Sequence, residues 1–330
     1  MSYNIKVSIL LPAYNAALYL RDSLDSIIRQ TFKDFEVLLI DDGSTDDTLK
    51  IANEYINVDK RIKFYKNEEN IGLIETLNKG LTLAQGDYIV RMDADDIMTD
   101  DRLYKQVKYM DSNPQCFVCG GQIEYIGNLN GNAPILPQKY EDLLYLSLTN
   151  CPLYHPTTII RNTAIKQFGL KYNDSYKHAE DYKFWSDIIF SHPNSIANLK
   201  DVVLYYRISN EQVTAKFSNE QNLVSKKIRR ENVQHVLSLY DIWLPEIINN
   251  EIIEKVSSLT KKNNIRATSS ILTLILCMLY MSMDNYHTRI KHFILSGDFY
   301  LYIKDFSKIQ LGLSIVLSGI FSNRGKRFVI

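Results

Sequence analysis

The sequence predicts an α/β fold, with a mostly parallel sheet flanked by helices and a helical C-terminal region. Two observations over the first 125 residues predict this class. Short apolar runs alternate with segments of helical periodicity, and most of the apolar runs end in turn-prone or acidic residues. An alternating strand–helix order implies parallel strands joined by crossover helices, which then cover both faces of the sheet.

Four apolar runs are predicted strands because they are too short for helices and are bounded by turn residues. They are Val7–Leu11, Phe35–Ile40, Ile62–Tyr65 and Tyr88–Met92. Helices are predicted over 18–28, around Leu49–Tyr55 and over 71–84, with Ser44 or Thr45 capping the second and Gly86 ending the third. No G-x-G-x-x-G follows the first strand, so a nicotinamide or flavin cofactor is unsupported.

The length of the chain, 330 residues, predicts more than one folding unit, since single cores stop growing near ~250–300 residues. We expect an α/β domain over residues 1–215, with a first half to about 125 and a less regular second half over 126–215. Residues 216–330 are expected to form the helical C-terminal region, because the pattern is almost wholly helical from about residue 219.

Two segments of the C-terminal region bear on membrane contact. Ser269–Met283 is apolar for about 15 residues, short of the ~20 that span a bilayer, so a buried helix is expected there. The last 20 residues combine an apolar stretch with Arg324, Lys326 and Arg327. That combination fits a segment lying on the membrane surface, and it equally fits a core helix whose basic end is solvated.

Composition narrows the class of protein. The formal net charge is zero, which argues against nucleic acid as the main partner. Residues 200–330 hold 18 Lys and Arg against 11 Asp and Glu, which gives +7 and leaves −7 on residues 1–199. An acidic half can hold a cation, while a basic half can meet anionic lipid or an anionic acceptor.

The cysteines and the N-terminus predict a cytoplasmic location. Cys116 and Cys119 form a C-x2-C, but no second pair follows at zinc spacing, so we expect buried thiols in a reducing compartment. The first residues lack the basic start, apolar core and cleavage site of a signal peptide.

Three carboxylates, Asp93, Asp95 and Asp96, follow the fourth predicted strand. Open α/β sheets bind ligands at the carboxyl ends of their strands. Acids this close repel one another unless a cation or a hydrogen-bonded ligand neutralises them, and Mg²⁺ or Mn²⁺ would do so with oxygen ligands shared with phosphates. The alternative is a polar turn that caps a helix starting near Asp100 or Asp101.

The order of five motifs resembles glycosyltransferase family 2, the inverting enzymes of the GT-A (Rossmann-like) fold. The motifs are VSILLPAYN, FEVLLIDDGSTDDT, the NxGL at Asn70–Leu73, RMDADD and HAEDYKFW, and the resemblance runs from about Lys6 to Ile208. The resemblance implies that residues 1–215 are the catalytic domain, with its nucleotide-binding half first and its acceptor half second.

The resemblance also implies which residues bind the donor. Pro12, Ala13 and Tyr14 would pack against a nucleotide base, and Asp41 would accept a hydrogen bond from the imide N–H of uracil. Asn70 would lie near the nucleotide, Asp93 would contact ribose or sugar, and Asp95, with Asp93, would hold Mn²⁺ or Mg²⁺ against the diphosphate. Asp96 would buttress the turn, and Arg207 would close over the diphosphate. Where many relatives have an arginine, this chain has Leu77.

On the acceptor side, the resemblance implies that Asp181 is the general base. An inverting transfer needs one carboxylate to take the proton of the attacking hydroxyl, and helical geometry would turn Glu180 elsewhere. His155 would position donor or acceptor, or it is a structural histidine before Pro156. Trp185 would be a platform for a sugar ring, or part of the core.

The predicted function is a metal-dependent inverting glycosyltransferase, either a hexosyl- or an N-acetylhexosaminyltransferase. It would move a sugar from a UDP-sugar to a hydroxyl of a glycan or lipid-linked glycan acceptor, in the synthesis of lipopolysaccharide, capsule or another cell-surface polysaccharide. Peripheral contact with the cytoplasmic face of the inner membrane would suit that acceptor. The alternatives are a sugar-nucleotide nucleotidyltransferase, which would need a Gly-rich basic phosphate loop in place of PAYN, and a non-catalytic nucleotide-binding partner of a glycan-assembly complex.

Overall fold

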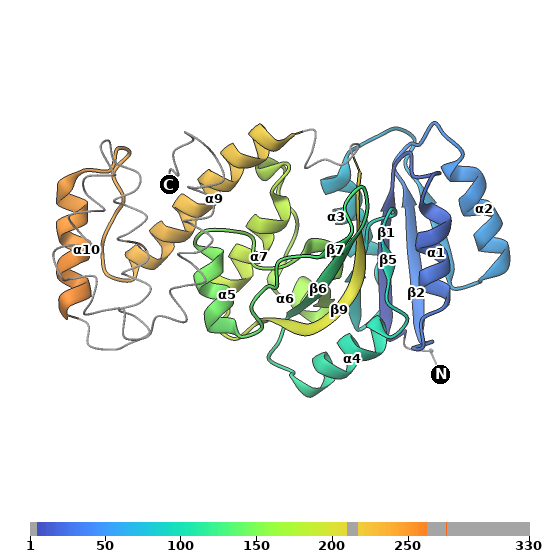
Figure 1. The fold of residues 1–330 in the computed structure, drawn as a ribbon, viewed down its shortest axis with the longest axis horizontal. Helices are drawn as coiled ribbons and strands as arrows, with labels where there is room; N and C mark the ends of the chain where they lie inside the picture. Colours follow the sequence, from blue (N-terminus) through green and yellow to red (C-terminus); the bar gives the residue numbers. More distant parts are fainter. Residues whose placement is uncertain (1–4, 210–216, 263–274, 276–330) are drawn as a thin grey trace. The chain divides into compact units, whose positions relative to one another are not determined.

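The computed structural model describes residues 5–209, 217–262 and 275 (Figure 1). The chain divides into two compact units. The first comprises residues 1–143 and 151–221, and the second comprises residues 144–150 and 222–330. The predicted boundary between residues 215 and 216 lies outside the described residues.

A mixed sheet, nine-stranded within the described residues, forms the centre of the first unit. Its first half is the predicted parallel sheet, with β1 (Val7–Ala13), β2 (Phe35–Asp41), β3 (Ile62–Lys66) and β4 (Tyr88–Arg91) in the order β3-β2-β1-β4. The chain therefore leaves β1 to one side for β2 and returns to its other side for β4. Such a change of direction opens a crevice at the carboxyl ends of the strands.

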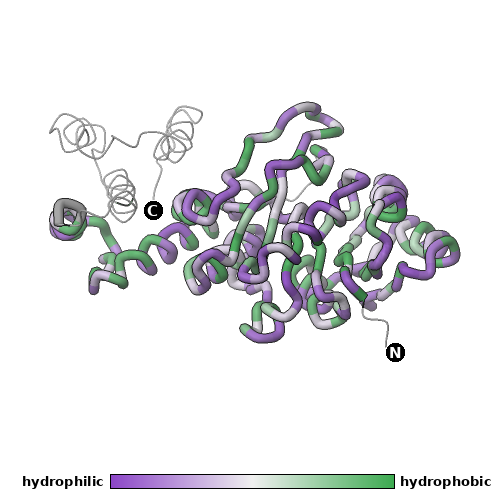
Figure 2. The backbone as a smooth tube through the Cα atoms, turned by 90° about the horizontal axis from the view of Figure 1, so that it is seen from below, coloured by the Kyte–Doolittle hydropathy of each residue, from purple (hydrophilic) through white to green (hydrophobic). Residues whose placement is uncertain are grey.

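Helices cover both faces of the parallel strands. On one face, α1 (Leu20–Ile28) and α2 (Thr48–Val58) join the strands in the main hydrophobic core. On the other face, α3 (Leu73–Leu83) contacts β1 and β2. Gly80 lets α3 approach closely, since a Cβ there would lie 2.0 Å from Leu10 Cδ1. Hydrophilic and hydrophobic residues alternate along the helical turns of the described chain (Figure 2), as expected of helices with one buried face.

Gly86 has a different role from the predicted one. α3 ends at Leu83, where Ala84 turns to an extended conformation. Gly86 instead lies against β1, because a Cβ there would lie 2.6 Å from the backbone nitrogen of Ser8. Its N–H donates to Ser8 Oγ at 2.8 Å. The glycine is therefore needed for close packing of two backbone segments.

The predicted caps of α2 are also wrong. The helix begins at Thr48, too far along the chain for Ser44 or Thr45 to cap it. Asp46 Oδ1 accepts from Thr48 N–H at 3.0 Å. Ser44 instead accepts from Asn15 N–H at 2.9 Å, so it joins the loop after β2 to the loop after β1.

The second half of the sheet adds antiparallel pairs. β8 (Ile159–Arg161) runs antiparallel to β4 and to β6 (Val118–Gly127). β9 (Ile196–Ile208) runs parallel to β6 and antiparallel to β5 (Ile97–Met98). The remaining elements are β7 (Gly131–Asn132), α4 (Arg102–Ser112), α5 (Tyr140–Ser147), α6 (Asn162–Phe168), α7 (Glu180–Ser191) and the 3₁₀ turns η1 (His155–Thr157) and η2 (Asp174–Tyr176). The α/β class is confirmed, with the parallel arrangement strongest in the first four strands.

The C-terminal region is helical where it is described. α9 spans Ser218–Ser238 and α10 spans Asn250–Lys262. Among the described residues, we find no helix with the length and apolar character that crossing a membrane requires. The predicted buried helix at 269–283 and the apolar-basic last 20 residues lie outside the described residues, apart from Ile275.

The thiols of the C-x2-C are buried, as predicted. Cys116 is 2% exposed and Cys119 is fully buried. Burial raises the pKa of the Cys116 thiol to about 12 and raises that of Cys119 as well. Both therefore remain protonated and pack as small apolar side chains.

Candidate active site

The site lies where β1, β2 and β4 end. Ala13 pairs with Asp41 in the sheet register, and Leu10 pairs with Arg91. The segments that follow these strands, among them the acidic turn after β4, therefore emerge at the same edge of the sheet. Open α/β sheets with such a change in strand order bind ligands at this edge.

Asp41 lies buried at the end of β2, and one of its carboxylate oxygens has no hydrogen-bond partner among the described residues. Its Oδ1 accepts from Ser44 N–H at 3.2 Å, while its Oδ2 is buried and has no hydrogen-bond partner within the described residues. Leaving a buried acceptor unpaired is costly, so such an atom is a candidate for a ligand's N–H. Pro12 and Ala13 are buried beside it in β1, and Tyr14 presents a half-exposed ring.

Asp42, which the sequence reasoning left without a role, holds the loop that carries Asn70. Its Oδ1 accepts from Asn67 Nδ2 at 2.8 Å and from Ile71 N–H at 3.0 Å, and its Oδ2 accepts from Gly72 N–H at 2.9 Å. Asn70 itself is exposed. The Asp-Gly pair at residues 42 and 43 is the sequence signal that could have indicated a turn here. In the structure Gly43 has φ +73, a conformation that glycine adopts readily.

We expect Asp42→Ala to lower the free energy of unfolding by about 3 kcal/mol, because three donors lose a charged acceptor and two of them are backbone N–H groups of the same loop. Urea denaturation of the purified variant measures this. Asp47→Ala is the matched control, because Asp47 is exposed and makes no capping hydrogen bond. That variant should stay within about 0.5 kcal/mol of the parent. Equal stability of the two variants would contradict this account of the loop.

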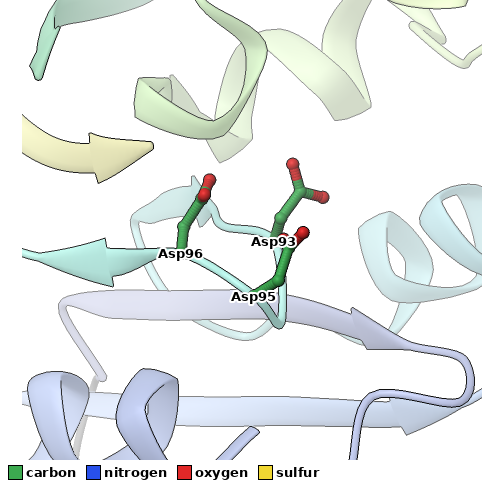
Figure 3. Close-up of side chains that lie close together, drawn as sticks. All are labelled: Asp93, Asp95 and Asp96. Atoms are coloured by element: carbon green, nitrogen blue, oxygen red, sulfur yellow. The ribbon is translucent and has the colours of Figure 1, made fainter. Parts of the chain in front are cut away.

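The acidic turn between β4 and β5 brings the three carboxylates together. One oxygen of each of Asp93, Asp95 and Asp96 lies within 4.8 Å of the others. The side chains rise from the turn to one side (Figure 3). Asp93 and Asp95 are partly exposed and Asp96 is fully buried. Burial, followed by the charges of Asp93 and Asp95, raises the pKa of Asp96 well above its ordinary value.

This donor set fits a hard divalent cation. All three groups offer carboxylate oxygens, which Mg²⁺ and Mn²⁺ prefer. The partly exposed Asp93 and Asp95 can reach an ion that is shared with a ligand, whereas Asp96 is buried and hydrogen-bonded to the backbone of β9. Its Oδ1 accepts from Arg207 N–H at 2.9 Å, and its Oδ2 is buried with no partner among the described residues.

Two arginines contact the acidic turn. Arg91, 3% exposed, forms an ion pair with Asp93. Arg207 donates from Nε to the carbonyl of Asp95 at 2.7 Å and from Nη2 to Asp22 at 3.1 Å, with its guanidinium 4.2 Å from the ring centroid of Tyr19. Arg207 thus ties β9 to the turn. Its predicted closure over a diphosphate stays a prediction.

Glu180 and Asp181 occupy the first turn of α7. Glu180 is 8% exposed, and burial together with the charge of Asp181 raises its pKa to about 7. Asp181 is partly exposed, and burial raises its pKa above the ordinary value as well. Arg91 opposes both shifts by its positive charge. A carboxylate with a raised pKa is a candidate proton acceptor.

His155 and Trp185 lie in an aromatic cluster. His155 Nε2 is 2.9 Å from the hydroxyl of Tyr172, and its ring centroid lies 5.9 Å from that of Trp185. Burial lowers the pKa of His155, so the imidazole is neutral. Trp185 is 0% exposed, which places its ring in the core and not on an accessible acceptor surface. Tyr172, missed by the sequence reasoning, is buried and stacks on Phe184 at 4.4 Å.

Comparisons with known proteins agree on one family. The sequence model of glycosyl transferase family 2 matches residues 8–169. A Haemophilus influenzae protein described as an uncharacterized glycosyltransferase is 35% identical over 299 residues, which cover 87% of this chain and 90% of that relative. The Escherichia coli enzyme WfgD, a UDP-Glc:alpha-D-GlcNAc-diphosphoundecaprenol beta-1,3-glucosyltransferase, is 30% identical over 211 residues, 63% of this chain and 79% of the relative.

A solved structure shares the fold. The crystal structure of S. aureus TarS residues 1–349 in complex with UDP-GlcNAc matches with a TM-score of 0.56 at 20% identity. The match covers 90% of this chain and 89% of the TarS chain.

Proposed function

Because the chain belongs to glycosyl transferase family 2 and is a glycosyltransferase with the GT-A fold, we propose that its donor is a UDP-sugar bound with a divalent metal ion. The acceptor is a hydroxyl of a glycan or lipid-linked glycan in the synthesis of a cell-surface polysaccharide. Transfer inverts the configuration at the anomeric carbon.

The observation that carries the proposal is the buried Oδ2 of Asp41 at the carboxyl edge of the sheet, which has no hydrogen-bond partner in the part of the chain that the structure describes. A carboxylate accepts hydrogen bonds and cannot donate them, so it selects a base that presents an N–H. The imide N–H of uracil supplies that donor. Tyr14, half-exposed at the end of β1, offers the base a ring to pack against.

On the same edge, Asp95 and Asp93 would hold Mn²⁺ or Mg²⁺ against the diphosphate. The ion, when bound, stabilises the negative charge of the departing UDP as a Lewis acid. Arg91 keeps Asp93 in place through their ion pair, and the backbone N–H of Arg207 donates a hydrogen bond to the carboxylate of Asp96. We assign Asp96 a structural role for this reason.

Asp181 is the proposed general base. It is the more exposed member of the pair at the start of α7, and one carboxylate suffices because a metal-bound UDP leaves without being protonated. Its pKa, raised by burial, makes it a stronger base than an ordinary aspartate. Glu180 and His155 are proposed to shape the acceptor side, and both are buried.

The acceptor class rests on a relative. WfgD, as its name states, acts on GlcNAc-diphosphoundecaprenol, a lipid-linked sugar. An acceptor of that chemistry would require this protein to work at a membrane surface. Peripheral association on the cytoplasmic face is therefore part of the proposal.

The decisive experiment is a donor screen. We expect the purified protein to hydrolyse at least one UDP-sugar slowly in the presence of Mn²⁺, with EDTA stopping the reaction. The panel includes UDP-glucose, UDP-galactose, UDP-N-acetylglucosamine and GDP-mannose. Hydrolysis of GDP-mannose alone would overturn the UDP assignment. Formation of a UDP-sugar from UTP and a sugar 1-phosphate would favour the nucleotidyltransferase alternative.

Asp41→Ala should weaken UDP binding about tenfold or more, because it removes a hydrogen bond to a charged acceptor. The preference of the parent for UDP over CDP should shrink as well, since cytosine lacks the imide N–H. Titration calorimetry with both nucleotides measures the two effects. Asp47→Ala, on the adjacent surface, should leave both affinities unchanged. An Asp41→Ala variant with the parent's UDP affinity would exclude Asp41 from the base pocket.

A further inference from the structure

A thiol lies against Asp181. Sγ of Cys151 is 3.6 Å from Asp181 Oδ2. Cys151 lies on the segment that leads into η1, is only partly exposed and forms no disulfide within the described residues. The other carboxylate oxygen, Oδ1, accepts from Tyr182 N–H at 2.7 Å. The helix backbone thus fixes one oxygen of Asp181, and the thiol contacts the other.

The thiol proton can reach more than one acceptor. Besides Asp181 Oδ2, the carbonyl oxygen of Leu153 lies 3.3 Å from Sγ. A thiol has one proton to donate, and an ionised acceptor forms the stronger bond. Cys151 therefore donates to Asp181 when the carboxylate is charged and to Leu153 when it is protonated. Burial, followed by the charge of Asp181, raises the pKa of Cys151, so the thiol keeps its proton.

We propose that Cys151 is a positioning residue that orients Oδ2 of Asp181 and favours its charged form. The inference rests on the proposed role of Asp181 as general base. A thiol is a weak donor, which orients the oxygen without holding it as firmly as an N–H would. Oδ2 stays available to take the proton of the acceptor hydroxyl.

The direction of the effect on pH dependence follows from the groups that face Asp181. Arg91, from β4, favours its charged form together with the Tyr182 N–H and the thiol, whereas burial disfavours it. Glu180, beside it on α7, titrates as part of the same pair, and the charge of Asp181 also raises the pKa of the neighbouring Tyr172. Because a hydrogen bond to the charged form lowers a pKa, loss of the thiol raises the pKa of Asp181. The acidic limb of the rate profile then moves to higher pH.

The test compares Cys151→Ala with Cys151→Ser in the full chain, using hydrolysis of the active UDP-sugar. We expect Cys151→Ala to lower kcat about three- to tenfold and to move the acidic limb of kcat up by about half a pH unit. UDP affinity should not change, since neither Asp181 nor the Leu153 carbonyl, to which the thiol hydrogen bonds, is assigned to donor binding. Cys151→Ser should recover part of kcat. A hydroxyl can donate a hydrogen bond to Asp181, but the C–O bond is shorter than the C–S bond, so the donor lies farther from the carboxylate.

Cys116→Ala is the matched control, since it also removes a buried thiol but lies away from Asp181. Cys116→Ala should lower the melting temperature, while the pH dependence of kcat should stay the same as in the parent. A Cys151→Ala variant with the parent's kcat and acidic limb overturns the positioning role. A loss of kcat in Cys151→Ala that is matched by an equal loss of UDP affinity also overturns the positioning role. The same holds if Cys151→Ser loses as much kcat as Cys151→Ala. If Asp181→Asn keeps full activity, it is the proposed base that fails.

Discussion

Asp181→Asn is expected to lower kcat about a hundred- to ten-thousandfold while leaving the affinity for UDP nearly unchanged. The amide keeps the size of the side chain and can still accept from Tyr182 N–H, but it cannot take a proton from the acceptor hydroxyl. Steady-state transfer assays and UDP titration of the same preparation separate the two effects.

The parent enzyme should also show an acidic limb in its pH–rate profile above the range of an ordinary aspartate. Burial raises the pKa of Asp181, and that of Glu180 to about 7. The base works only when it is deprotonated, so the rate falls as the pH drops through the apparent pKa of this pair. In Asp181→Asn this limb should disappear from the residual activity.

Asp187→Asn provides the matched control for this variant. Asp187 lies on the same helix, is about half exposed and forms a partly exposed ion pair with Lys183. The same chemical change there should leave kcat within a factor of two, since exposed pairs contribute little. The base assignment would be refuted by an Asp181→Asn enzyme that turns over within tenfold of the parent.

The second large effect is expected from Asp95→Ala, which should weaken Mn²⁺-dependent UDP binding about a hundredfold or more, since even the loss of a residue that only supports a metal ligand costs about 10–100-fold. Removing one carboxylate takes away a ligand and also lowers the negative charge that attracts the cation. Calorimetry of UDP binding in Mn²⁺ and in EDTA measures the metal-dependent part of the affinity.

Asp100→Ala is the matched control for the acidic turn. Its side chain is exposed, beyond the turn, and lies 3.6 Å from Arg29. We expect unchanged UDP affinity in both conditions. Equal Mn²⁺-UDP affinity of Asp95→Ala and the parent would remove Asp95 from the metal site.

The parallel half of the fold could be predicted because each of its strands and helices shows a clear pattern within a short, continuous stretch of sequence. The strands are short apolar runs, and parallel strands bring their carboxyl ends to one edge. The carboxylates that follow β4 were therefore expected at the carboxyl edge of the sheet, and the register of β1 with β2 and β4 brings the ends of these strands to one edge.

The contacts that complete the site could not be predicted because their partners are far apart in the chain. Asn78 donates to the carbonyl of Tyr172 at 3.0 Å and accepts from its N–H at 2.9 Å, across 94 residues. Nothing in the spacing of either residue indicates the other. Trp185 shows the related difficulty with helices, since periodicity did not say whether its ring faces the core or the surface.

The bond between Asp96 and the backbone of Arg207 spans 111 residues. A ribosome that adds 5–20 residues per second needs about 6–22 s to make that stretch of chain. Throughout this interval the nascent chain carries the acidic turn without the strand that fastens it. The three carboxylates are therefore synthesised well before the strand whose backbone hydrogen-bonds to Asp96 and completes the turn.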